Sequence, residues 1–204
     1  MKKIVSISIL SLLVITSACK KGDNDPFISL QSRTSRISGS WKVTTEAIST
    51  TDTDPQGSVT VNSIYNGRMK ARNTTTRTAN TSISVNDTIY YSHTLVLNND
   101  GTYVQNVINN NGMDLKTFEG TWIFLGESEI NNLKNKEAIL LTKTKATIHD
   151  GITTNVLNYT DLDGITLVID ELRSNKMVTI VSKTYANEDT KKYGSSEVKT
   201  TYTR

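Results

Sequence analysis

Apolar and polar residues alternate with a period of two over most of the chain after residue 38, which is typical of β-strands with one buried face. The alternation is clearest where Tyr91, His93, Leu95 and Leu97 are separated by mostly polar neighbours. The Asn-Asp-Gly at 99–101 follows directly, and Asp-Gly after such a run favours a hairpin turn that needs positive φ. Runs and turns of this kind predict nine strands, at 41–48, 90–97, 102–109, 115–125, 138–148, 153–159, 165–172, 177–185 and 196–203.

The short connections between these runs predict an all-β fold, an antiparallel up-and-down meander closed into a barrel of about eight to nine strands. One short helical turn is expected before it, at 27–33. In the first strand, the alternation predicts that Trp41, Val43, Thr45 and Ala47 share one face.

Residues 50–88 break the pattern, because threonine, asparagine and serine dominate and few apolar residues are available for burial. We expect one or two long, exposed strands here, with a polar crest between them. Arg68, Lys70, Arg72 and Arg77 form the densest basic stretch of the chain. Such a run is typical of a solvated edge strand, where charge discourages pairing with other sheets.

The N-terminus has the order of a secretory signal, with Lys2 and Lys3, an apolar run at 4–15, small residues, and the single cysteine Cys19. The apolar run is too short to span a bilayer. This segment resembles a bacterial lipoprotein signal, which implies cleavage after residue 18 and acylation of the Cys19 thiol. We therefore expect a signal peptide at 1–18, a lipid-anchored tether at 19–26 and one domain at 27–204. The anchor implies the bacterial outer membrane, on its periplasmic or its cell-surface face.

Charge excludes one class of partner. The chain has 23 basic and 20 acidic side chains and a formal net charge of +3. Removal of Lys2 and Lys3 with the signal lowers this value to +1. A nearly neutral domain has no electrostatic reason to bind nucleic acid.

The motif Gly39-Ser40-Trp41 lies at the start of the first strand, after the expected helical turn and before the series of hairpins. In this order of elements, segment 27–204 is similar to the lipocalin-like lipoproteins of Bacteroidetes. The resemblance implies that Gly39 permits close packing at the barrel floor and that Trp41 plugs the closed end. Leu162 stands where the second lipocalin motif has an aromatic residue. Arg173 is the nearest candidate for the late arginine that packs over the tryptophan.

The resemblance also implies a pocket for a small apolar or amphipathic ligand inside the barrel. The same alternating residues could instead fill a dry core. A second hypothesis is a non-catalytic envelope module that contacts a glycan or a protein through its loops. The candidate pocket residues are His93, Leu95, Leu97, Trp122, Phe124, Leu140, Leu167 and Ile169.

Catalytic chemistry has little support in the sequence. His93 and His149 are far apart and have no metal-ligand spacing, and no Gly-x-Ser-x-Gly elbow or phosphate loop is present. Carboxylate pairs such as Asp170 and Glu171 are expected to be solvated acids near turns. We therefore expect no enzyme activity, no metal and no cofactor.

Overall fold

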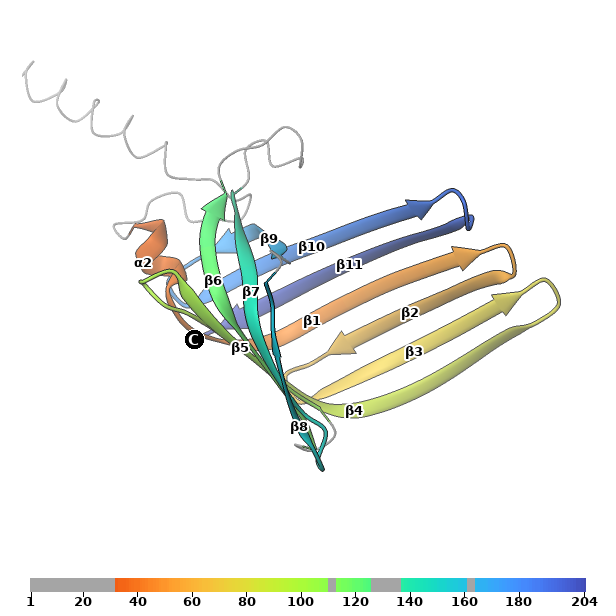
Figure 1. Ribbon diagram of the computed structural model, residues 1–204, viewed down its shortest axis with the longest axis horizontal. Coiled ribbons are helices and arrows are strands. Elements are labelled where there is room, and N and C mark those ends of the chain that lie inside the picture. Colours follow the sequence, from red (N-terminus) through yellow and green to blue (C-terminus); the bar gives the residue numbers. More distant parts are fainter. Residues whose placement is uncertain (1–31, 110–112, 126–136, 161–163) are drawn as a thin grey trace, which may run out of the picture.

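The computed structural model describes residues 32–109, 113–125, 137–160 and 164–204. This part of the chain contains eleven antiparallel strands and the helix α2 (Arg33–Ile37), which begins at the last residue of the expected helical turn (Figure 1). Residues 27–31 of that turn lie outside the described residues. The strands are β1 (Gly39–Asp54), β2 (Gly57–Tyr65), β3 (Met69–Thr78), β4 (Ser82–Leu97), β5 (Thr102–Asn109), β6 (Asp114–Leu125), β7 (Glu137–His149), β8 (Thr154–Asn158), β9 (Gly164–Leu172), β10 (Lys176–Asn187) and β11 (Lys192–Thr203).

The strands follow one another around the sheet in nearly the same order as in the chain. β11 pairs back with β1, and β6 pairs with β7, so ten of the strands described here close into a barrel. β8 is the exception, because within the described residues it pairs with β7 only. The predicted all-β, up-and-down barrel is confirmed. The extra strands are β2 and β3, which lie in segment 50–88, where the sequence predicted one or two long strands without giving their bounds.

Segment 50–88 forms more regular structure than expected. The distal halves of β1 and β4, together with β2 and β3, make two long hairpins that extend away from α2 (Figure 1). Side-chain hydrogen bonds cross the outer face of these hairpins, from Thr51 to Thr60, from Thr75 to Ser84 and from Asn73 to Asn86. Polar side chains therefore bond to one another across the strands, where other sheets would pack apolar residues. β3 lies between β2 and β4, so the basic stretch is not on an edge strand.

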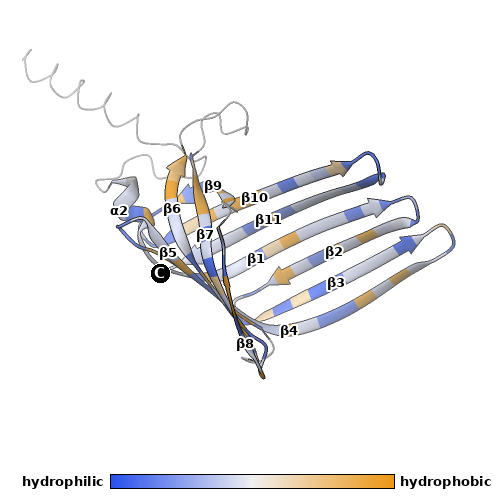
Figure 2. Cartoon of the chain, in the orientation of Figure 1, coloured by the Kyte–Doolittle hydropathy of each residue, from blue (hydrophilic) through white to orange (hydrophobic). Residues whose placement is uncertain are grey.

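The hydrophobic core lies at the end of the barrel next to α2. Figure 2 shows hydrophobic colour concentrated around β6, β7 and β9, and hydrophilic colour at the tips of the long hairpins. Trp41, Leu97, Leu172 and Met177 are fully buried there, beside Ile37 of the helix. The helix also contributes Arg36, which is buried and donates from Nη1 to the carbonyl oxygen of Leu172 at 2.7 Å.

Arg204 packs over Trp41 at this closed end. The guanidinium carbon lies 4.3 Å from the indole centroid, and Nη2 donates to the carbonyl oxygens of Arg36 at 2.6 Å and of Ser38 at 2.5 Å. The indole N–H donates to the carbonyl of Ile37 at 2.6 Å. The cation–π contact with Arg204 and the hydrogen bond from the indole N–H to the end of the helix together fix the position of the Trp41 side chain.

The sequence-based candidate for this arginine, Arg173, is wrong. Its guanidinium lies 2.5 Å from Glu171 on the β9–β10 turn. The packing arginine is Arg204, because the antiparallel pairing of β1 with β11 returns the end of β11 to the start of β1. Gly39 (φ 134°) makes this possible, since a Cβ there would lie 3.3 Å from Arg204 Nη2.

Arg204→Ala should lower the free energy of unfolding by about 1–2 kcal/mol, because it removes the cation–π contact and two donors from the closed end. Urea unfolding followed by tryptophan fluorescence measures the change. Arg173→Ala is the matched control and should have a smaller effect, since Lys176 remains 2.7 Å from Glu171. Equal losses in the two variants would contradict this role of Arg204.

Candidate functional site

The barrel contains a cavity of about 390 Å³ above its closed end, and this cavity is open to solvent. Strands β1, β3, β4, β5, β9, β10 and β11 contribute to its walls. We call two groups within its lining the polar floor and the apolar collar, and the remaining lining residues are Ile165, Thr179, Lys183, Ser196, Thr200 and Tyr202. The polar floor consists of Glu46, Lys70, Tyr91, His93 and Gln105, and the apolar collar consists of Ile48, Val107, Leu167, Val181 and Val198.

A β-bulge places Glu46 on the floor. The pairing of β1 with β11 shifts register between Val43 and Thr45, so the alternation of inner and outer residues is reset. Trp41 and Val43 face inward as predicted, whereas Thr45 and Ala47 are exposed and Glu46 is buried. The predicted shared face is therefore wrong beyond Val43, because the bulge moves every later side chain to the opposite face.

Glu46 and Lys70 form a buried ion pair. Lys70 Nζ lies 2.6 Å from Glu46 Oε1, and the glutamate side chain is only 6% exposed. The same ammonium lies 3.5 Å from the centroid of the Tyr91 ring, which adds a cation–π contact. Lys70 thus belongs to the interior and not to the solvated surface that its basic neighbours predicted. Three partners from three strands hold one another in place.

His93 lies beside this pair. The side-chain nitrogen of Gln105 lies 2.8 Å from Nε2, while Nδ1 lies 3.4 Å from the Tyr91 hydroxyl and 3.7 Å from Glu46 Oε2. With the amide in this orientation, Gln105 donates to Nε2, and Nδ1 faces Tyr91 and Glu46.

The floor keeps Glu46 ionised and the nearby tyrosines neutral. Burial alone would raise the pKa of Glu46, but the contacts with His93 and Lys70 outweigh it and lower the pKa to about 2. Burial raises the pKa of Tyr91 and of Tyr202, and the negative charge of Glu46 adds to both shifts. The tyrosine hydroxyls therefore remain hydrogen-bond donors. The floor therefore offers a ligand the Glu46–Lys70 ion pair, whose charges cancel, and neutral tyrosine hydroxyls that can donate hydrogen bonds. Such groups suit the polar end of a ligand.

The sequence-predicted pocket residues separate into three groups. His93 and Leu167 line the cavity. Leu95, Leu97, Trp122 and Ile169 are buried in the core cluster towards the closed end, and Phe124 packs against that cluster. The indole N–H of Trp122 donates to the carbonyl of Asn98 at 2.9 Å. Leu140 alternates with the core residues Ile139 and Leu141, so it faces away from the interior.

Sequence reasoning missed most of the floor. Glu46 was hidden by the bulge, and Lys70 by the basic run around it. Tyr91 carried a usable signal, since it lies two residues before His93 and four before Leu95 and therefore on the same face of its strand. The predicted lipid-attachment residue Cys19 lies outside the described residues.

The acidic pair at the end of β9 is also buried, contrary to expectation. Asp170 lies 3.3 Å from Lys199, and Glu171 contacts both Arg173 and Lys176. These ion pairs tie β9 to β10 and β11 near the closed end. They lie outside the lining of the cavity.

No protein-family profile matches the chain, and no curated protein matches it in sequence. Among the residues that the structure describes, no helix has the length and apolar character needed to cross a membrane. Within the same residues, no three His, Cys, Asp or Glu side chains are grouped as a metal ion would require. What the protein does must be inferred from the fold and the geometry of the cavity.

Glu46 should make stability fall in acid. Its pKa is about 2 in the folded protein and 4.5 in an unstructured peptide, which represents the unfolded chain, so its contribution is complete above pH 4.5 and is lost as the pH falls towards 2. The loss should amount to about 3 kcal/mol. Urea unfolding over this pH range should show a steeper loss in wild type than in Glu46→Gln.

The matched control for this pH series is Glu119→Gln. Glu119 also pairs with a lysine, at 2.8 Å, but both side chains are well exposed. Its removal should leave the pH dependence nearly unchanged. If the free energy of unfolding changed with pH in the same way in wild type and Glu46→Gln, the lowered pKa of Glu46 would be refuted.

Proposed function

We propose that this protein is a lipid-anchored outer-membrane lipoprotein whose barrel binds a small amphipathic ligand. The polar end of the ligand lies on the polar floor, and its apolar body lies against the apolar collar. The observation that carries the proposal is the cavity of about 390 Å³, which has the Glu46–Lys70 pair at its base and both aliphatic and polar side chains around it. This volume falls in the range of small-molecule sites, which are mostly apolar with a few convergent polar groups.

The arrangement of the floor supports an amphipathic ligand over a purely apolar one. A ligand without polar atoms would cover the Tyr91 hydroxyl and the Glu46–Lys70 pair without replacing their contact with water. A ligand with a strong net charge would meet a pair whose charges already compensate each other. A neutral or weakly charged polar group that can both donate and accept hydrogen bonds fits best.

The anchoring part of the proposal rests on the leader and on Cys19. Three acyl chains bury far more methylene groups than the single chain that binds a membrane only marginally. A barrel tethered through residues 19–26 would then work close to the lipid phase, where amphipathic ligands are available.

Val181→Trp should fill part of the cavity and weaken binding of a dansylated fatty alcohol by about tenfold or more. Fluorescence titration measures the affinity. The matched control is Ser182→Trp, because residue 182 follows on the same strand and is exposed. Equal affinity in wild type and Val181→Trp would overturn interior binding. Native mass spectrometry of the extracted protein should also reveal a bound small molecule.

Cys19→Ser should release the protein from the membrane fraction and abolish incorporation of labelled palmitate, because only a thiol accepts the diacylglycerol. Ser6→Ala, in the same leader, should change neither property. Continued sedimentation of Cys19→Ser with membranes, together with palmitate labelling, would contradict the anchor. This outcome is independent of ligand binding in the barrel.

A further inference from the structure

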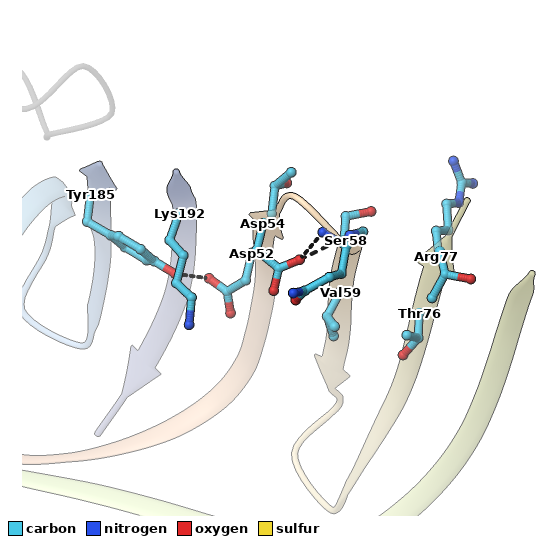
Figure 3. Close-up of a pocket in the computed structure, with 12 residues that line it drawn as sticks. Asp52, Asp54, Ser58, Val59, Thr76, Arg77, Tyr185 and Lys192 are labelled. Atoms are coloured by element: carbon cyan, nitrogen blue, oxygen red, sulfur yellow. Dashed lines mark hydrogen bonds between the residues drawn. The ribbon is translucent and has the colours of Figure 1, made fainter. Parts of the chain in front are cut away.

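A second concave surface lies at the tips of the long hairpins, on the inner face of the sheet. We call it the distal groove. It has a volume of about 390 Å³ and is lined by residues of β1, β2, β3, β10 and β11, with the turn after β1. Figure 3 shows its side chains spread across neighbouring strands. None of its lining residues also lines the interior cavity.

Tyr185 lies across β11 in this groove. A Cβ on Gly194, its partner on that strand, would come within 2.1 Å of Tyr185 Cε1, so only glycine lets the ring lie against the backbone here. The hydroxyl donates to Asp52 Oδ1 at 2.8 Å, two strands away from its own (Figure 3). The hydrogen bond to Asp52 raises the pKa of Tyr185. The ring is thus held at both ends, yet the residue is 53% exposed.

Two carboxylates stand next to this ring. Asp52 and Asp54 are two residues apart on β1 and therefore point to the same face. Asp54 Oδ1 accepts from the backbone N–H groups of Gln56 at 2.8 Å and Gly57 at 3.0 Å, which fixes its orientation. Each carboxylate is held through one oxygen, and its second oxygen is available for a ligand.

The remaining lining argues against a strongly charged or a purely apolar ligand. Lys192 and Arg77 bring two positive charges to the groove beside the two acids, while Val59 and Thr76 supply small aliphatic surface. The groove thus offers the fixed, exposed ring of Tyr185, the oriented carboxylates of Asp52 and Asp54, and both charged and aliphatic side chains beside them. These groups suit a polyhydroxylated ring that has one apolar face. The C–H face of a sugar packs on the aromatic ring, and its hydroxyls donate to carboxylate oxygens.

We propose that the distal groove binds a neutral oligosaccharide, with one sugar ring stacked on Tyr185 and hydroxyls hydrogen-bonded to Asp52 and Asp54. Five neighbouring strands line the groove, and four spacings of about 4.8 Å make it about 19 Å long. This length suits several linked sugars better than one. The site is separate from the interior cavity, so it stands or falls independently of the proposed function.

Isothermal titration calorimetry with three tetrasaccharides (maltotetraose, cellotetraose and tetra-N-acetylchitotetraose) tests the proposal on the full chain. We expect saturable binding of at least one of them. Tyr185→Ala should then weaken that binding by about tenfold, because it removes the stacking surface. Gly194→Ala should weaken it as well, by displacing the ring without removing it.

Tyr193→Ala is the matched control for Tyr185. Tyr193 is 49% exposed and precedes Gly194 on β11, so its side chain points to the opposite face of the same sheet. Its removal should leave saccharide binding unchanged, as should the cavity variant Val181→Trp. Loss of binding in Val181→Trp alone would place the sugar in the interior cavity and overturn the proposal.

Three further results would overturn it. The first is that none of the tetrasaccharides binds. The second is equal affinity in wild type and Tyr185→Ala. The third is that calcium chloride gives the only saturable signal and that this signal is lost in Asp54→Asn, which would make the two acids a cation site. Circular dichroism of each variant shows whether the barrel is still folded.

Discussion

Strand β1 changes partners along its length, and the shape of the molecule depends on that change. Its first residues, Gly39 to Lys42, pair directly with β4, whereas from Glu46 onward it pairs with β2. β2 and β3 therefore enter the wall only above the closed end. Because barrel diameter grows with the number of strands, the wall is narrow around Trp41 and wider above it. The narrow end packs solidly, and the wider part leaves room for the cavity.

The bulge in β1 lies at this transition and decides the chemistry of the interior. By resetting the alternation after Val43, it points Glu46 at Lys70 and His93 and not at solvent. Protonating Glu46 alone would leave Lys70 buried without its charged partner, whereas replacing both partners with apolar side chains of similar volume is often neutral for stability. Apolar side chains would fill the same floor at least as well. That balance favours a role for the pair in recognising a ligand over a role in holding the barrel together.

The inner face of the sheet continues from the interior cavity to the distal groove. Alternate residues of β1 pass from Glu46 through Ile48 and Thr50 to Asp52 and Asp54, so one strand serves both surfaces. Their environments differ. Charges on the floor are shielded from water and interact strongly, whereas those at the hairpin tips are hydrated and act mainly through hydrogen-bond geometry. The two surfaces therefore suit ligands of different polarity.

The sequence alone determined the fold class, the turn at Gly101 and the inward face of Trp41 and Val43. These depend on local alternation and on a turn that needs positive φ. Only the tertiary structure decided that Arg204 covers Trp41, since strand closure brings together residues from opposite ends of the domain. It also decided that Lys70 faces inward. A period-two pattern gives two faces but does not say which is buried, and a single bulge exchanges them.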